Sequence, residues 1–450
     1  MKIHLLDVGE QQYGDCILVE HEGKTILIDG GHPRDAVLIG EQLAGLLGPS
    51  PHRIDLLIVT HCHADHIGCL PELVESGTID VQKALVADET LGWPHYNPSD
   101  DRARESDSIT SPNSPLHLLS EALLEEPLVD STDEELSRFL EDVGTIQDKY
   151  LRMLDAFPRV VRYGTASQRS ISALERQFDS FGLKIIGPTK DHLKKCAEFI
   201  VSEAERNQDV AESDQALSET DLIAQYRRAV EQKLKVLTTS VDSASAEDRI
   251  GPGSARNNQS IVVKVSGGGF SALLAGDMQF AAPEVPGLDG MMTALREKIK
   301  DAGPFDFVKL THHTSYNGFD ESVLNDYPGC KNFAHTGGLY DPKHPDPAVL
   351  QFLAEQGNEI YFARTDRNGL ITVSRTRDGM RMEVARGGLN NFEANRRRPN
   401  QDDPYEIKQE REAPLSAENG SNDYVEVTAK VPHRSTRVTI TIDVDPEKKK

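Results

Sequence analysis

The chain has 450 residues and a formal net charge of −24, which disfavours counterion-driven binding of nucleic acid by the surface as a whole. Its length suffices for two or three domain-sized units, and no apolar run reaches the ~18 residues needed to cross a bilayer. The five cysteines are scattered and odd in number, which predicts free thiols, a reducing compartment and hence a cytoplasmic location.

The first 96 residues predict strands and helices in tight succession. Apolar-rich runs with a hairpin signal at 21–23 predict paired strands, and a nearly wholly apolar run at 54–59 predicts a buried strand. The loop residue His32 is expected at the surface. The expected elements are strands at 1–7, 15–20, 24–29, 54–59 and 81–87, and helices at 35–47 and 67–75.

A polar loop, Thr60-His61-Cys62-His63-Ala64-Asp65-His66-Ile67-Gly68, joins the buried strand to the next helix. Ligands of α/β sheets tend to lie at such strand ends. His61 and His63, two residues apart in an extended loop, can direct both imidazoles to one side, so they can hold one metal. Asp65 and His66 follow where the loop becomes helical and can hold a neighbouring metal. Imidazole suits zinc, and a carboxylate also tolerates manganese or iron.

From residue 97 to 254 the chain is acidic and mostly helical, which predicts a large insertion that also carries sheet-edge strands. The run from Glu121 to Asp142 holds nine acidic residues and one basic residue, Arg138, and predicts a solvated helical face. Residues 100–250 are a candidate lid or protein-binding arm, and 242–258 resemble a linker. The expected elements are helices at 132–156, 166–181, 190–207 and 213–239, and strands at 159–163 and 183–186.

The second half, 255–388, repeats the order of strand hairpin, helix and strand, with polar residues at strand ends. Asp277 ends one strand, and His312 and His313 end another. The repeat predicts an α/β fold of two facing sheets with helices outside and a site along their shared edge. Residues 389–450 are expected to be a flexible linker and a small β-hairpin. The expected elements are strands at 260–265, 270–275, 305–310, 332–335, 359–363, 370–374, 381–385, 424–431 and 437–444, and helices at 291–300 and 347–356.

The metal loop, together with Asp29 at a strand end, resembles the metallo-β-lactamase superfamily, whose fold is a four-layer αββα sandwich. Within that superfamily the chain is similar to the hydrolase domain of ComEC-type competence proteins and its free-standing relatives. Two departures are the longer spacing between Gly9 and Gly14, and Thr314 where that family usually has glycine; the chain also lacks the membrane channel of the competence proteins. The matching motifs are Asp7-Val8-Gly9 with Gly14-Asp15, Asn258-Gln259-Ser260, Leu274-Ala275-Gly276-Asp277, His312-His313-Thr314-Ser315, His344-Pro345 and residues 364–369.

The resemblance implies a role for each matched residue. Asp277 is expected to bridge two metals, and one of His312 and His313 to be the remaining ligand, with His313 favoured. The expected metal ligands are His61, His63, Asp65, His66, Asp277 and His313. The expected catalytic residues are Asp65, His312 and His344. The expected supporting residues are Asp7, Asp15, Asp29, Asn258 and Ser260.

These residues predict a hydrolase with two divalent metals, zinc first and manganese second, that uses a metal-bridging hydroxide. The resemblance favours a phosphodiester substrate, either nucleic acid or a small nucleotide, and therefore a phosphodiesterase or nuclease. One alternative is a hydrolase of carboxylic esters, lactones or thioesters at the same site. A second is a scaffold that binds a partner through the helical insertion.

Overall fold

Two β-sheets carry the fold of the computed structural model. The structure describes residues 1–9, 13–93, 115–125, 131–210, 219–238, 252–339, 341, 343–377 and 379–395. The chain divides into units Met1–Arg396 and Arg397–Lys450, and every described residue belongs to the first. The hairpin predicted at 424–431 and 437–444 lies outside the described residues.

The first sheet has eight strands in the order β16-β15-β1-β2-β3-β5-β7-β8. β1 pairs antiparallel with both β2 and β15, so the start of the chain lies beside a strand from the end of the described region. From β3 to β8 the neighbours are parallel, and their carboxyl ends meet at one edge. The bounds are β1 Lys2–Leu5, β2 Ile17–His21, β3 Lys24–Ile28, β5 Leu56–Val59, β7 Ala84–Ala87, β8 Val160–Tyr163, β15 Ile371–Thr376 and β16 Gly379–Val384.

The second sheet has six strands in the order β14-β13-β12-β11-β10-β9, and β11 to β14 are parallel. The outer strands β8 and β9 both come from the insertion, so the insertion contributes one edge strand to each sheet. A small parallel pair, β4 (His52–Ile54) and β6 (Ile79–Val81), stands apart. The bounds are β9 Lys184–Gly187, β10 Val262–Gly267, β11 Phe270–Leu274, β12 Phe307–Lys309, β13 Asn332–His335 and β14 Tyr361–Arg364.

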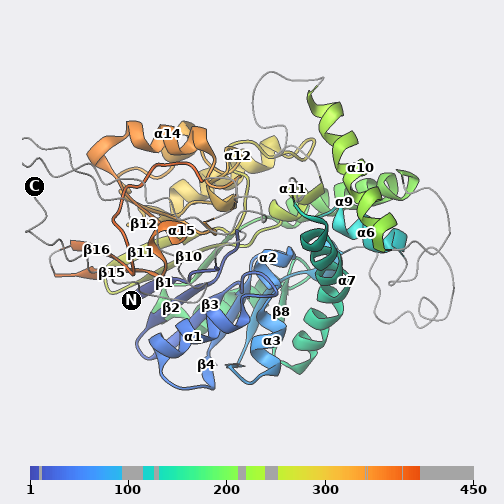
Figure 1. Cartoon of the computed structure of the whole chain (residues 1–450). Helices are drawn as coiled ribbons and strands as arrows, with labels where there is room; N and C mark the ends of the chain where they lie inside the picture. The colour runs from blue at the N-terminus through green and yellow to red at the C-terminus, as the bar shows by residue number, and fades with distance from the viewer. Residues whose placement is uncertain are drawn as a thin grey trace, which may run out of the picture. The chain divides into compact units, whose positions relative to one another are not determined.

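Side chains alternate between the two faces of each strand, so apolar residues fill three layers. One lies between the two sheets, and the other two lie between each sheet and the helices outside it. Along β5, Leu56 and Ile58 join a core with residues of the second sheet, such as Val263, whereas Leu57 and Val59 face helices on the other side. Figure 1 shows the helices outside the two sheets. This arrangement confirms the predicted αββα sandwich. The helices that pack on the first sheet are α1 Ala36–Leu47, α3 Leu70–Glu75 and α7 Asp133–Ala156; those on the second are α9 Lys190–Val210, α12 Asp289–Ala302 and α14 Pro347–Glu355.

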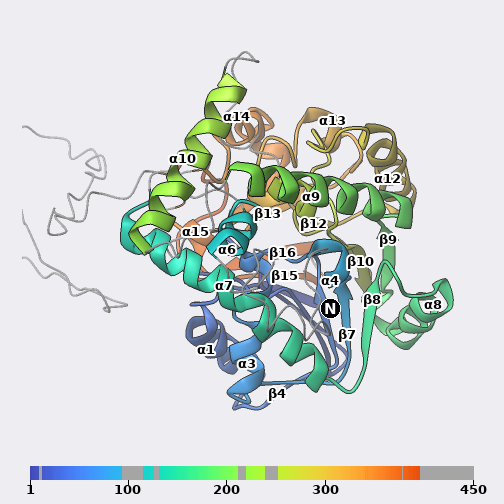
Figure 2. The same cartoon turned by 90° about the vertical axis from the view of Figure 1, so that its right-hand side faces the viewer.

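The insertion helices have a small apolar core of their own. α6 (Pro115–Ala122), α7 and α10 (Glu219–Thr238) bury leucines and Tyr226 against one another. α7 begins with a capping box, in which Thr132 Oγ1 accepts from the Glu135 amide (3.2 Å) and the Glu135 carboxylate accepts from the Thr132 amide (2.9 Å). Figure 2 shows α6 close to α7 and α9. In the part of the chain that the structure describes, no helix is both long and apolar enough to span a bilayer.

Two local predictions about the insertion are wrong. Glu121 and Glu125, expected on a solvated face, are only 5% and 7% exposed, because an arginine pairs with both of them. The segment expected to be a linker at 242–258 contains the short helix α11, Pro252–Asn257. The rest of that predicted linker, up to residue 251, lies outside the described residues.

Candidate metal centre

The metal loop leaves the buried strand β5 and enters α2, Ala64–Ile67, so Asp65 and His66 lie in a helical turn. The helix predicted from Ile67 to Glu75 is instead split into α2 and α3 around Gly68. A side chain at Gly68 would clash with Pro33, since a Cβ there would lie 2.3 Å from the Pro33 nitrogen. This close packing fixes the direction in which the metal loop turns.

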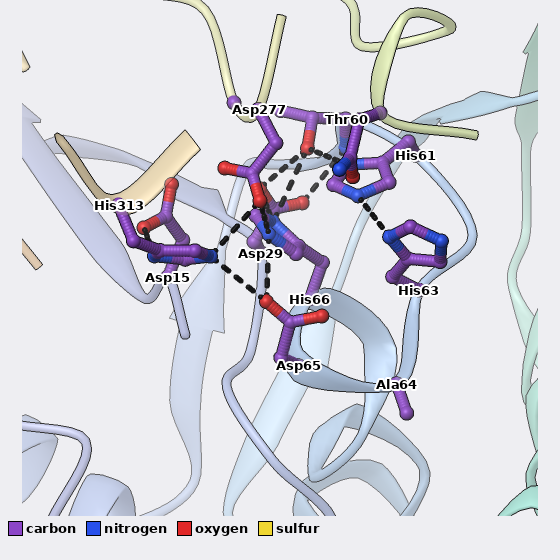
Figure 3. Close-up of polar contacts among 12 residues, drawn as sticks. Asp15, Asp29, Thr60, His61, His63, Ala64, Asp65, His66, Asp277 and His313 are labelled. Carbon is purple, nitrogen blue, oxygen red and sulfur yellow. Dashed lines mark hydrogen bonds and ion pairs between the residues drawn. The ribbon is translucent and has the colours of Figure 1, made fainter. Parts of the chain in front are cut away.

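Four side chains from distant parts of the chain form one cluster, called here the four-residue site: Asp65, His66, Asp277 and His313. Their ligand atoms all lie within 4.8 Å of one another. His313 Nε2 is 3.0 Å from Asp65 Oδ2 and 2.9 Å from Asp277 Oδ2. His66 Nε2 is 3.1 Å from Asp277 Oδ2. Figure 3 shows all four side chains directed toward one point.

His61 and His63 form a second group beside the first, called here the two-imidazole site. Nε2 of His61 is 3.1 Å from Nδ1 of His63, so both nitrogens face the same space. The ring centroids of His61 and His66 are 4.1 Å apart, which makes the two sites neighbours (Figure 3). The structure therefore brings together all six residues that were predicted as metal ligands.

Hydrogen bonds from surrounding groups orient the histidines. The Asp29 carboxylate accepts from His66 Nδ1 (2.8 Å) and from the amide and hydroxyl of Thr60 (2.7 Å each), which turns His66 Nε2 toward the cluster. The Thr336 carbonyl accepts from His313 Nδ1 (3.1 Å). Ser260 Oγ accepts from the Asp277 amide (3.0 Å) and lies 3.3 Å from His61 Nδ1. Such outer contacts fix ring orientation and tune ligand basicity.

A fully buried lysine that was absent from the sequence prediction supports the site. Lys309 Nζ donates to the carboxylate of Asp15 and lies 3.6 Å from Asp277 Oδ1. Burial alone lowers the pKa of Lys309, but the carboxylates of Asp15 and Asp277 outweigh it and raise the pKa. The signal in the sequence was a single lysine inside the apolar run that forms β12, since a buried charge requires a partner.

The electrostatics of the four-residue site are those of a buried ion cluster. Burial lowers the pKa of His313, yet Asp277, Asp65 and Asp15 raise it to about 10. Burial raises the pKa of Asp65, yet His66 and His313 hold it well below its usual range. In the protein without metal, protonated imidazoles therefore balance the carboxylates. A divalent cation provides the same positive charge when these protons leave.

The residues present fit a metal pair. Their donors are imidazole nitrogens and carboxylate oxygens, a set that suits zinc or manganese. His63 Nε2 and Asp277 Oδ1 are buried polar atoms with no hydrogen-bond partner. Unsatisfied polar atoms in a buried site are uncommon, and a bound ion or water is a standard explanation for them.

The two predicted catalytic histidines differ in their surroundings. His312 receives a hydrogen bond on Nε2 from Asn257 Nδ2 (2.9 Å), and its Nδ1 bonds to the Asn317 amide oxygen, so both ring nitrogens are engaged. His344 bonds through Nδ1 to Asp341 (2.9 Å), while its buried Nε2 has no hydrogen-bond partner. The ring of His344 lies 5.7 Å from that of His313, centroid to centroid.

Among the predicted supporting residues, Asp15, Asp29 and Ser260 contact the metal loop or a candidate ligand. Asp7 instead accepts from the Gly9 amide (3.1 Å) and from Arg386 (3.0 Å). The Asn258 side chain donates to the Ser254 carbonyl (2.8 Å) and to Gln279 (2.7 Å).

His32, which the sequence placed on the surface, is half-buried near the cluster. Burial lowers the pKa of His32 to about 4, while Asp65 raises it in part. A cavity of about 310 Å³ is lined by His32, by Ala64 of the metal loop, and by Arg138 and Phe139 of α7. The insertion thus forms one wall of the space next to the metal loop.

Residues 9–145 match the sequence profile of the Metallo-beta-lactamase superfamily. Two solved structures are similar at low scores. One is a mutant of CmlA beta-hydroxylase, with 13% identity, a TM-score of 0.33 and coverage of 82% of this chain but only 53% of that chain. The other is the metallo-β-lactamase MIM-1 from Novosphingobium pentaromativorans, with 12% identity, a TM-score of 0.30 and coverage of 79% and 91%. The similarity to the metallo-β-lactamase superfamily is thus carried by residues 9–145, which include the metal loop, and the αββα sandwich brings that loop into a His/Asp cluster able to bind metal ions.

Proposed function

We propose that this protein is a two-metal hydrolase that cleaves phosphodiesters. The observation that carries the proposal is the adjacency of the two groups of ligands, with His61 of the two-imidazole site 4.1 Å from His66 of the four-residue site, centroid to centroid. A pair of cations held by these two neighbouring groups of residues would activate water and neutralise charge on the attacked phosphorus.

The chain's own residues prepare the site for that chemistry. Asp29 and the Thr336 carbonyl hold His66 and His313 with Nε2 toward the cluster, so no reorientation is needed on binding. Asp65 and Asp277 supply the negative charge that would retain cations, and they would orient the attacking hydroxide. The burial of the cluster excludes bulk solvent and strengthens these interactions.

His344 is assigned the proton transfer to the leaving group. Its Nδ1 bonds to the Asp341 carboxylate, which orients the ring, and its Nε2 is the ring nitrogen left for a substrate oxygen. His312 has both nitrogens engaged by Asn257 and Asn317, so we assign it a structural role.

A small or tightly held phosphodiester suits the surroundings best. The net charge of −24 opposes loose binding of a long polyanion. The resemblance of the strand-end motifs to the competence-type hydrolase domain supports the choice of phosphodiester over ester.

A substrate panel with added zinc or manganese tests the proposal. It includes bis-p-nitrophenyl phosphate, single-stranded DNA, RNA, cyclic nucleotides, carboxylic esters, lactones and thioesters. We expect turnover of phosphodiesters and none of the carbonyl substrates, with loss of turnover in Asp277→Asn. Turnover of esters, lactones or thioesters alone would identify the alternative hydrolase. Full biological function of Asp277→Asn would instead support the scaffold.

A further inference from the structure

The two halves of the metal centre have unequal numbers of ligands. The four-residue site has two imidazoles and two carboxylates. The two-imidazole site has His61 and His63, and among the described residues no third His, Cys, Asp or Glu places a ligand atom within 4.8 Å of both. The two-imidazole site therefore has no carboxylate of its own to balance the charge of a cation.

A buried charged cluster, formed by Arg256 and two glutamates of the insertion, stands beside this site. Arg256 of α11 is fully buried and donates to Glu121 (2.7 Å), to Glu125 (2.8 Å) and to the Gly92 carbonyl (3.0 Å). One guanidinium thus faces two carboxylates, and the cluster carries one negative charge in excess. A buried charge in excess is costly unless a counter-charge lies nearby.

Only one of the two carboxylates contacts the metal loop. Glu125 accepts from the amide of Ala64, the residue between His63 and Asp65, at 3.1 Å. Glu121 is directed elsewhere, since its second contact is Gln147 Nε2 at 2.8 Å. Burial raises the pKa of Glu125, and the nearby His63 and Arg256 lower it in part. The hydrogen bond to Ala64 therefore places the Glu125 carboxylate, and not that of Glu121, next to the two-imidazole site.

We propose that Glu125 is a positioning residue of the metal centre, which fixes the loop at Ala64 and supplies the negative charge that the two-imidazole site lacks. The inference rests on the proposed metal-dependent function. It makes the helical insertion a part of the metal centre, in addition to a possible surface for partners. The insertion reaches the loop through Glu125, which follows α6 and accepts from the Ala64 amide at the start of α2.

A purely structural role for Glu125 predicts a different result, because an amide oxygen accepts from the Ala64 amide as well as a carboxylate does. Glu125→Gln keeps that acceptor and removes the charge. Glu121→Gln is the matched control, because Glu121 bonds to the same guanidinium and is equally buried, at 5% exposed against 7%, yet does not contact the loop. Glu125→Asp keeps the charge and shortens the side chain.

The experiment measures the number and affinity of bound Zn²⁺ ions by equilibrium dialysis at buffered free Zn²⁺, and the visible spectrum of the Co²⁺-loaded full chain. We expect two ions in the wild type and in Glu121→Gln. In Glu125→Gln we expect one ion at unchanged affinity and about 10- to 100-fold weaker binding of the second. Glu125→Asp should bind the second ion with intermediate affinity. Circular dichroism confirms that each variant is folded, and if Glu125→Gln does not fold, the comparison of Glu125→Asp with Glu121→Gln decides.

Two outcomes would overturn the inference: wild-type affinity for both ions in Glu125→Gln, or an equal loss in Glu121→Gln. If the wild type binds two ions with the expected differences between variants but hydrolyses no phosphodiester, the inference stands and the proposed substrate class fails. If the wild type binds no metal, both fail.

Discussion

Lys309 and Asp15, 294 residues apart in sequence, form a fully buried ion pair that links the two sheets. Lys309 ends β12 in the second sheet, whereas Asp15 immediately precedes β2 in the first. The same ammonium lies 3.6 Å from Asp277 Oδ1. The pair therefore joins the halves of the sandwich at the point where the metal ligands meet.

Removal of one partner of this pair should destabilise the metal-free protein strongly. Lys309→Met leaves a buried carboxylate without its partner, and we expect a loss of about 3–5 kcal/mol in the free energy of unfolding. Lys309→Met combined with Asp15→Asn should recover part of that loss. Urea unfolding of the wild type, the two single variants and the double variant measures the coupling energy between Lys309 and Asp15. The exposed Lys298→Met is the control and should change stability by less than about 0.5 kcal/mol. Additive losses in the double variant would contradict the role of the pair.

Asp29 should control metal affinity without touching the metal. Asp29→Asn keeps an acceptor for the Thr60 amide but places an amide group next to His66 Nδ1, which disturbs the tautomer that directs Nε2 to the cluster. We expect about 10- to 100-fold weaker Zn²⁺ binding at the four-residue site. Competition with a chromophoric chelator measures it. Asp55→Asn, whose carboxylate contacts Thr25 and Arg53 away from the cluster, should leave affinity unchanged.

His344 should matter most for substrates with poor leaving groups. If its Nε2 delivers the proton, His344→Gln should lower kcat about 10²- to 10⁴-fold for an alkyl phosphodiester. The decrease should be far smaller for a p-nitrophenyl phosphodiester, because p-nitrophenolate leaves without protonation. Rate measurements with a series of leaving groups give this dependence. His312→Gln should lower stability with no such dependence, since both of its nitrogens bond to asparagines. An equal effect of His344→Gln across the series would refute proton transfer by His344.

A histidine of the insertion should make the fold sensitive to mild acid. His192 of α9 is 1% exposed and donates through Nε2 to the Asn258 carbonyl (2.8 Å), and burial lowers its pKa from 6.5 to about 4. Between pH 6.5 and about 4 the unfolded chain binds a proton at His192 that the folded chain excludes. The contribution of the neutral imidazole to the free energy of unfolding is therefore fully present above pH 6.5 and is lost as the pH falls toward 4. The loss is about 3 kcal/mol at most. His192→Gln keeps a donor without the titration, so its unfolding midpoint should fall less with acid than that of the wild type. Parallel pH profiles for the two proteins would contradict this assignment.

The strand ends that carry ligands were predictable because each is a local signal, an apolar run that stops at polar residues. β5 with the metal loop, β11 with Asp277 and β12 with His313 all follow this pattern. The fold class followed from the repetition of the same order of elements in both halves. Local sequence thus contained most of the metal centre.

The missed features depend on partners far away in sequence. The acidic run at Glu121 has the local pattern of an exposed face, and only Arg256, 135 residues later, makes it a buried cluster. The hydrogen bond between His312 and Asn257 was equally unpredictable from local sequence, because the two residues are 55 positions apart. Gly68, where the predicted helix is interrupted, packs so closely against Pro33 that a side chain would clash, a contact that no periodicity reveals. These pairings are set by the tertiary fold rather than by propensity.

The position of β1 between β2 and β15 has a consequence for biosynthesis. During synthesis one edge of β1 stays open until residues 371–376 have been made, and open strand edges pair readily with other chains. His61 and His63 also emerge long before Asp277 and His313. A nascent chain therefore exposes the imidazoles of His61 and His63 and one open edge of β1 until β15 has been made. We expect it to depend on chaperones and to acquire its full metal content only after residue 376 has emerged.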